Sequence, residues 1–547
     1  MYFDLHTHPA FKSYLTDEEL GKKDDAWTTY RNCIDFAVGN IIDSQASLRQ
    51  LDRSRTRSAV AAIYVMEDGL DEIFLITRLA PVISHLDKDI VRDIRPVQYW
   101  KRFLEKVKHL ENSLPARGPG KAFQIASTAG ELTETNNNLI LAIEGAHILK
   151  VEETDDPLLR LDYLKSFRHK VFYLTLCHFA RNSFCNQAFA MKLVNPKKVP
   201  TFLPLGTGLT EEGKAVIRRC YDTTRGRRIL IDVKHMSLSG RQQFYAWKKA
   251  DPDMRTIPII ASHVGVTGIS WERNSRRAYY RQTEYLRDMD QYVVKYKRPK
   301  GLRLEKLKSY FNPTTINLFD EEIVEIIESG GLIGLMMDQR QLGVSKKPFE
   351  YFDAPDFNAL ERGGLPKEYK LAPPPADKVL AGEAEEDEVE DLTRRGYREL
   401  LTLPDLDVRE TFSDFTERAR SFFKEDEPAE YDVTERDSYT SLTLSKRKRR
   451  HLLHIANNLL HIAKVGGPAA WQHVCLGSDF DGLVDAPNNC QNVTEYRELE
   501  IQLYHVIMQL IDTGGSGFRE RYHLGDVRWQ LRRFMYDNGR AFVENHL

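Results

Sequence analysis

Eight short apolar segments, each followed by a polar or ionisable residue, constrain the fold of this chain more than any other feature. They are continuous rather than alternating in hydrophobicity, which is typical of strands buried on both faces of a parallel sheet. Helical patterns separate several of them. Eight such strands predict an α/β fold, a (β/α)8 TIM-like barrel with large, mainly helical insertions. The segments are Tyr2–Leu5, Ala59–Val65, Leu139–Ile143, Val171–Leu176, Ile229–Val233, Ile257–Ala261, Leu332–Met337 and Val474–Leu476.

The spacing of these segments is uneven, and we interpret the long gaps as insertions into one barrel. The fifth and sixth segments are one short βα unit apart. The gap before the eighth holds the Pro-rich piece LAPPPADK, the acidic run EAEEDEVED and the basic run KRKRR. We therefore expect residues 1–547 to form a single barrel with insertions at approximately 68–136, 268–315 and 345–450.

Composition excludes several classes of protein. The 78 Lys and Arg residues against 80 Asp and Glu give a net charge of −2, which argues against a protein that coats nucleic acid or an anionic membrane. No apolar run reaches the ~18 residues of a membrane span, and the N-terminus lacks a signal-peptide pattern. The six cysteines form no CxxC pair, which fits a reducing compartment. We expect a cytoplasmic protein that acts on a small molecule, without a nucleic-acid or membrane partner.

Metal-type side chains gather where the predicted strands end. In such a barrel the carboxyl ends of the strands face the active site. A lone histidine after a strand is usually a hydrogen-bonded structural residue, but burying many such groups together is costly unless a metal satisfies them. The set therefore predicts a metal site at one rim. Its members are His6, His8, Glu144, His178, His235, His263 and Asp479.

The residue types indicate which chemistry the site would support. Imidazole and carboxylate ligands suit Zn²⁺, with other divalent metals as alternatives. A carboxylate shared between two ions can bridge them, and two ions can activate a water molecule for attack on a carbonyl. A further carboxylate can accept the proton of that water and pass it to the leaving group. The sequence thus favours a metal-dependent hydrolase.

Several motifs resemble the membrane (renal-type) dipeptidase family of the amidohydrolase superfamily. The pieces occur in the order of the family and cover roughly half of the chain; IEG, DVKHMS, ASH and GSDFDG are specific in combination. The matching pieces are LAIEGAHIL, FYLTLCHFARNSFCNQ, GLTEEGKAVIRRCYDTTRGRRILIDVKHMS, PIIASHVG, ESGGLIGL, HIANNLLHIAKVGGPAAWQHVCLGSDFDG and NGRAFVENHL.

The resemblance implies a site with two Zn²⁺ ions and a role for each ligand. His6 and His8 would hold one ion, His235 and His263 the other, and Glu144 would bridge them. Asp479 would contact the first ion and move the proton. His178 corresponds to the substrate-side histidine of the family, which would stabilise the oxyanion. The resemblance also implies cleavage of a dipeptide or related small amide, and a homodimer.

Two departures from the family pattern bear on specificity. The first strand carries HTH where the family usually has HxD, so the metal preference can differ. The family also has an arginine after the sixth strand that binds the substrate carboxylate, and the corresponding piece here, YFNPTTINLF, lacks it. Arg273 is the candidate replacement for substrate binding, although a surface position is the simpler interpretation.

Two other functions remain open. The opening DLHTHP also resembles PHP-type phosphoesterases, which hold metals with histidine-rich sites on a related barrel. Alternatively, the barrel is a non-catalytic binding module whose insertions form the interaction surface. Hydrolysis of a phosphate ester alone would favour the first alternative, and a chain without bound metal or hydrolase activity would favour the second.

Overall fold

The computed structural model describes residues 1–15, 25–30, 43–70, 94–118, 120–190, 199–344, 347–362 and 446–547. Most of the insertion predicted at 345–450, including the acidic run, lies outside these residues. The basic run at the end of this insertion is described and begins helix α14, Lys446–Gly466.

Eight parallel strands form a closed barrel. Their order is β1-β2-β4-β5-β6-β7-β12-β14. The first and last strands meet through a parallel bridge between Thr7 and Phe480, beside hydrogen bonds from Asp479 N–H to His6 O and from His8 N–H to Phe480 O, both 2.9 Å. The predicted barrel is confirmed. Its strands are β1 Tyr2–Thr7, β2 Thr56–Tyr64, β4 Asn137–Glu144, β5 Val171–Thr175, β6 Leu230–Asp232, β7 Ile260–Val264, β12 Leu332–Leu335 and β14 Val474–Leu476.

Each predicted apolar segment contains or overlaps one barrel strand, because the strands are buried on both faces. In β4 every residue is buried. The sixth segment is displaced: β7 begins at Ile260 rather than Ile257, so His263 lies within the strand instead of after it. A short extra strand, β3 Phe123–Ile125, pairs with β4 outside the barrel order.

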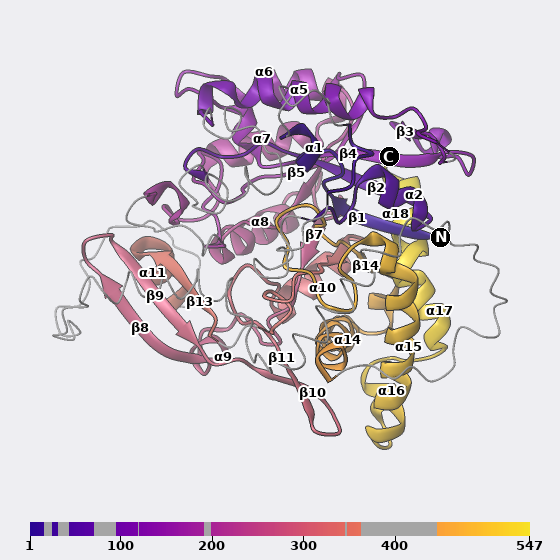
Figure 1. Cartoon of the computed structure of the whole chain (residues 1–547). Coiled ribbons are helices and arrows are strands. Elements are labelled where there is room, and N and C mark those ends of the chain that lie inside the picture. Colours follow the sequence, from indigo (N-terminus) through magenta and orange to yellow (C-terminus); the bar gives the residue numbers. More distant parts are fainter. Residues whose placement is uncertain are drawn as a thin grey trace.

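Helices surround the barrel (Figure 1). The C-terminal helix packs on the first strand, where a Cβ on Gly539 would lie 2.0 Å from Phe3 Cδ1, so this close approach requires glycine. The helices are α1 Phe11–Tyr14, α2 Leu48–Arg53, α5 Tyr99–Asn112, α6 Pro157–Lys165, α7 Glu211–Tyr221, α8 Leu238–Ala250, α9 Arg273–Arg277, α10 Asp320–Glu328, α11 Ala354–Arg362, α14, α15 Tyr496–Thr513, α16 Phe518–Arg521, α17 Val527–Arg532 and α18 Asn538–His546.

The region 268–315 differs from the expectation of mainly helical insertions. Apart from α9, it forms the strands β8 Tyr280–Leu286, β9 Gln291–Tyr296, β10 Lys300–Leu304 and β11 Leu307–Tyr310. Their aromatic and β-branched residues favour strands over helices. Strand β13 Phe349–Asp353, from the next insertion, completes a three-stranded antiparallel sheet of order β13-β9-β8.

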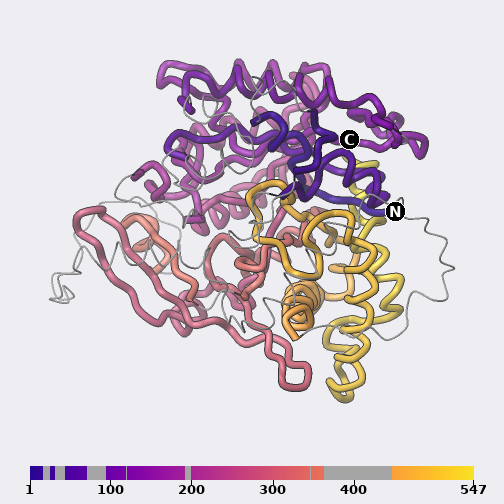
Figure 2. Tube along the Cα trace, viewed as in Figure 1, coloured from indigo at the N-terminus to yellow at the C-terminus, as the bar shows by residue number. Residues whose placement is uncertain are grey.

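This small sheet stands apart from the helices of the C-terminal region, as the chain trace shows (Figure 2). The apolar side of the sheet packs against the helix layer around the barrel. Val294 and Phe352 cluster with Leu238, at the start of α8, and with Phe319, directly before α10. Within the described residues, no helix combines the length and the apolar character needed to cross a bilayer.

Candidate metal centre

The predicted metal-type residues converge on one carboxylate. Glu144, the last residue of β4, has its Oε1 3.4 Å from the Nε2 atoms of three histidines and 3.6 Å from that of His178. Its Oε2 lies 3.4 Å from His8 Nε2. Glu144 and all five histidines are at most 3% exposed. The three histidines at 3.4 Å from Oε1 are His6, His235 and His263.

Asp479 closes the cluster from the loop after β14. Its Oδ1 lies 3.2 Å from His8 Nε2 and 3.7 Å from His6 Nε2, and its Oδ2 lies 3.9 Å from His263 Nε2. Its side chain is 14% exposed, more than that of any other member of the cluster. Asp479 is therefore the member with the best access to solvent and substrate.

The residues fall into two groups with ligand atoms close enough for one ion each. One group is His6, Glu144, His263 and Asp479; the other is Glu144, His178 and His235. Glu144 belongs to both, which is the position expected of a bridging ligand. The division differs in detail from the pairing that the family resemblance implies, because His263 lies with the first group and His178 with the second. The individual roles stay predictions.

Hydrogen bonds on the outer ring nitrogens fix the tautomers of three histidines. Tyr173 Oη donates to Leu5 O and so accepts from His6 Nδ1, 2.7 Å away. His8 Nδ1 donates to Ala62 O at 3.0 Å. With the proton on Nδ1, each ring turns the lone pair of Nε2 towards the cluster, as a metal ligand requires.

His263 follows the same rule, and the ring of His178 is held in place by a carboxylate. Ser262 Oγ donates to Asp232 and accepts from His263 Nδ1 at 2.8 Å. His178 Nδ1 donates to Glu67 Oε2 at 3.0 Å. The carboxylates behind these rings raise the basicity of the nitrogens that face the cluster.

The cluster presents several buried lone pairs that a cation could bind. Glu144 Oε1 is buried and makes no hydrogen bond. The Nε2 atoms of His6 and His8 face each other at 3.1 Å, and those of His235 and His263 at 3.2 Å. Buried nitrogen lone pairs held this close together around an unsatisfied carboxylate fit one or two divalent ions with imidazole and carboxylate preference.

Two of these residues adopt backbone conformations that side chains rarely take. His235 has φ 68° and Asp479 has φ 62°. Such conformations cost of order 1–3 kcal/mol and cluster at functional sites. In both cases the left-handed residue lies three positions after the end of a barrel strand, and its side chain belongs to the cluster.

Two buried aspartates that no sequence motif marked support the residues of the cluster. Asp4, inside β1, accepts from Ser478 N–H, Ser478 Oγ and Tyr496 Oη, and thereby joins the first and last strands. Asp232, at the end of β6, accepts from Ser262 and Thr175. Burial raises the pKa of both carboxyl groups. An aspartate inside an otherwise apolar strand was the available signal for each.

Glu67 is a further supporting residue, on the loop after β2. Its Oε1 accepts from the backbone N–H groups of Phe179 and Ala180, and Tyr64 Oη donates to its Oε2. Although burial opposes it, the His178 imidazole lowers the pKa of Glu67 to about 2. Conversely, Glu67 and Glu144 overcome burial and raise the pKa of His178. No sequence motif marked Glu67.

Two cations lie beside the cluster. Lys234 precedes His235, is 1% exposed and donates to Gln341 Oε1 at 2.9 Å. Arg340 follows β12, and its Nε donates to both oxygens of Asp338 at 3.0 Å.

Arg273, the predicted substrate-binding residue, is not brought to the cluster. Its side chain is 43% exposed, lies 3.5 Å from Glu361 and lines an outer cavity of about 290 Å³ that includes none of the metal-type residues.

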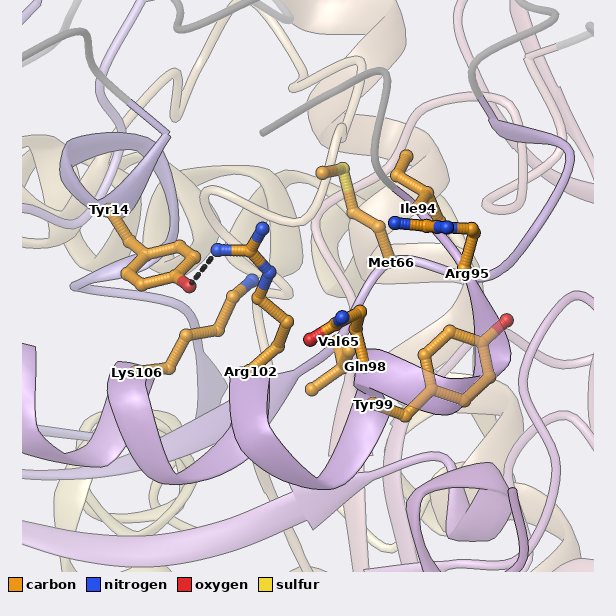
Figure 3. Close-up of a pocket in the computed structure, with 9 residues that line it drawn as sticks. All are labelled: Tyr14, Val65, Met66, Ile94, Arg95, Gln98, Tyr99, Arg102 and Lys106. Carbon is orange, nitrogen blue, oxygen red and sulfur yellow. Dashed lines mark hydrogen bonds between the residues drawn. The ribbon is translucent and has the colours of Figure 1, made fainter. Parts of the chain in front are cut away.

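A second, smaller pocket lies between the end of β2 and α5 (Figure 3). In that view Lys106, Arg102 and Tyr14 lie on one side of it and Tyr99 on another. Lys106 donates to Tyr64 O at 2.8 Å and so supports the loop that carries Glu67. With a volume of about 20 Å³ the pocket has room for one water molecule and not for a dipeptide.

Comparison with known proteins identifies the family that shares this arrangement. The family model described as membrane dipeptidase (peptidase family M19) matches residues 17–275 and 308–508, well over half of the chain. A curated protein of Schizosaccharomyces pombe (strain 972 / ATCC 24843), uncharacterized dipeptidase C965.12, is 48% identical over 44 residues, which are 8% of this chain and 10% of that protein. The match thus spans about a tenth of the length of that relative.

Solved structures with a similar course of the chain are distant in sequence. A metallo peptidase from Rhodobacter sphaeroides, liganded with a phosphinate mimic of the dipeptide L-Ala-D-Ala, is 14% identical with a TM-score of 0.43, and the comparison covers 100% of this chain and 99% of that one. The probable dipeptidase PvdM from Pseudomonas aeruginosa is 16% identical with a TM-score of 0.41, covering 89% and 90%.

Proposed function

Because this chain belongs to the membrane dipeptidase family, peptidase family M19, we propose that it is a binuclear zinc hydrolase that cleaves a dipeptide or a related small amide. One observation carries the proposal. Five buried histidines turn Nε2 towards the unsatisfied carboxylate of Glu144, and three of them are held in the tautomer that a metal ligand requires. Scaffold histidines have no reason to share this orientation.

In the proposed site Glu144 would be shared by two zinc ions. His6, His8 and Asp479 would hold the first ion, and His235 and His263 the second. Bound zinc would supply Lewis acidity towards the scissile carbonyl and the attacking water. The remaining steps belong to side chains of this chain.

Asp479 is the proposed proton carrier. Its Oδ1 and Oδ2 lie within the cluster, and its partial exposure allows it to accept a proton from the attacking water and deliver it to the leaving amine. His178 stabilises the developing negative charge on the carbonyl oxygen. Glu67 holds Nδ1 of that ring and favours its protonated form, so that Nε2–H can donate.

We also propose a cytoplasmic location and a homodimer. The described cysteines, Cys177, Cys185, Cys220, Cys475 and Cys490, are all free and buried, which suits a reducing compartment. The homodimer rests on the family resemblance, and light scattering coupled to size-exclusion chromatography would test it. We propose further that the chain forms a single barrel with three insertions.

The first test is the metal content per chain of protein purified without chelator, before and after dialysis against zinc. We expect two ions per chain and a decrease when Glu144 is changed to Gln. We also expect hydrolysis of members of a panel of L,L- and L,D-dipeptides, and a loss of about 10²- to 10⁴-fold in kcat for Asp479→Asn.

A neighbouring aspartate offers a matched control. Asp481, in the same loop, accepts from Gln45 N–H and Ala46 N–H and pairs with Lys12 Nζ at 2.8 Å, so Asp481→Asn removes a charge of equal size without touching the cluster. Equal activity loss in both variants, or hydrolysis of phosphate esters without hydrolysis of any dipeptide, would contradict the proposal. A chain without metal or activity would instead support a binding module.

A further inference from the structure

Among the described residues, Lys234 is a buried cation beside the metal centre that forms no ion pair, and its position points to a role in substrate binding. We propose that Lys234 binds the carboxylate of the substrate and gives this site its preference for anionic substrates. The inference rests on the proposed function and adds a residue for specificity that neither the family match nor the sequence motifs assign.

Lys234 is held at the rim by its own backbone. Its N–H donates to Asp232 Oδ1 at 3.1 Å, directly after β6, and the next residue is His235. The side chain is 1% exposed, and its ammonium group has one hydrogen bond, to the neutral amide oxygen of Gln341. Because an ammonium group has three N–H donors, two of them remain available.

The ammonium group lies within the electrostatic reach of the cluster. The carboxylates that act on its charge include Asp479 and Glu144, and its charge acts in turn on His235 and His263. No described carboxylate is close enough to form an ion pair with it. Lys234 thus interacts electrostatically with the cluster but forms no ion pair with its carboxylates.

The summed charge of the proposed site indicates which kind of ligand it would bind. Two divalent ions would contribute +4 against −2 from Glu144 and Asp479, so the centre would stay positive. Lys234 adds a further positive charge beside it. Positive charges buried together repel strongly at low dielectric, and an anion that enters between Lys234 and the metals would relieve this repulsion. A substrate carboxylate has that charge.

The other cations at the rim are already paired. Arg340 is neutralised by Asp338 and also donates to Leu483 O. Lys12 pairs with Asp481 at 2.8 Å. Among the described residues around the cluster, Lys234 is therefore the cation that remains for a substrate.

The test compares Lys234→Met with the wild-type protein, both loaded with zinc, on Ala-Ala and on its C-terminal amide. Loss of a charged hydrogen bond predicts an increase of about 10- to 100-fold in KM for the free acid, with kcat and the metal content little changed. For the amide we expect less than a twofold change. Lys234→Arg, which keeps the charge, should restore part of the preference for the acid.

A second buried lysine serves as the control for loss of a lysine from the interior. Lys165 donates to the backbone carbonyls of Cys220 and Arg227 and lies outside the cluster, so Lys165→Met should leave the acid-to-amide preference unchanged. Direct binding of a phosphinate analogue of Ala-Ala, as free acid and as methyl ester, gives a readout that does not depend on turnover.

The outcomes separate the two proposals. An unchanged preference in Lys234→Met, or a fall in its metal content, overturns the role of Lys234 and leaves the hydrolase intact. A wild-type protein that hydrolyses neither substrate overturns the proposed reaction. If that protein still binds the free-acid analogue, and Lys234→Met weakens this binding selectively, the carboxylate role is supported on its own.

Discussion

At the scale of single residues, the metal-facing side chains depend on neighbours that never touch the metal position. The hydroxyl of Tyr173, the carbonyl of Ala62 and the hydroxyl of Ser262 each decide which nitrogen of a histidine carries the proton. A histidine whose Nδ1 loses its hydrogen-bond acceptor can rotate or change tautomer. Substitutions behind the ligands should therefore affect catalysis almost as much as substitutions of the ligands.

Glu67 offers the clearest test of this dependence. Glu67→Gln keeps the size of the side chain but weakens its hydrogen bond to His178 Nδ1, so we expect kcat/KM to fall about 10- to 100-fold with the metal content unchanged. Steady-state kinetics and elemental analysis of the purified variant would measure both. Glu105→Gln is the control, because Glu105 bonds Tyr14 Oη and lies outside the cluster. Similar losses in the two variants would count against a positioning role for Glu67.

The sequence predicted the members of the cluster better than the residues that hold them in place. Candidate ligands such as His6 and Glu144 follow continuous apolar segments, and the barrel geometry brings them together. Glu67 could not be recognised, since its contact with His178 depends on how the loop after β2 crosses towards β5. Arg273 was chosen by proximity to the sixth strand, whereas the structure directs that segment into α9 on the outside.

At the scale of elements, the strands of the barrel were predictable and the small sheet was not. A strand such as β4 is buried along its whole length, so its sequence alone identifies it. The pairing of β13 with β9 joins residues more than fifty positions apart, at 349–353 and 291–296. Because strand pairing over such a distance leaves no local pattern, the sequence could indicate insertions but not that two of them share a sheet.

A buried acid pair at the edge of this sheet predicts a pH dependence of stability. Burial raises the pKa of Asp353 to about 8 and that of Asp356 to about 6, and the proximity of the two carboxyl groups adds to the shift of Asp353. Asp353 accepts from Gly206 N–H and Asp356 from Ser239 Oγ. In the unfolded chain both groups have a pKa of about 3.9.

The raised pKa values mean that the folded protein retains protons that the unfolded chain releases. The stabilisation is fully present below about pH 4 and is lost as the pH rises towards about 8. Asp353→Asn is neutral throughout, so its unfolding temperature should decrease less than that of the wild type between pH 5 and pH 8, by a few degrees. Thermal unfolding monitored by circular dichroism would measure this. The exposed Asp512→Asn should behave like the wild type, and parallel curves for all three proteins would contradict the prediction.

At the scale of the whole molecule, the candidate metal centre lies where the first and last strands of the barrel meet. His6 lies in β1, His8 directly follows it, and Asp479 comes after β14, so an ion held by all three would link the two ends of the barrel. A ligand that binds only the folded state stabilises it by about 2.7 kcal/mol at a concentration of one hundred times its Kd.

Removal of the metal should therefore lower the thermal stability of the protein. We expect a chelator to reduce the unfolding temperature by several degrees, and zinc to restore it. Differential scanning fluorimetry with and without chelator would measure the shift. Glu144→Gln, which removes the shared ligand, should show little or no response to either treatment. A wild-type protein that is insensitive to both would show that metal and barrel closure are independent.

The seam between β1 and β14 also sets an order of events during synthesis. His6 and His8, in and directly after β1, are synthesised first, but β14, at Val474–Leu476, is made more than 460 positions later. At about 5–20 residues per second this interval lasts about 20 to 90 seconds. A nascent or truncated chain that lacks β14 therefore leaves the edges of β1 and β12 unpaired. Asp479, which follows β14, joins the other members of the cluster only when translation of the chain is nearly complete.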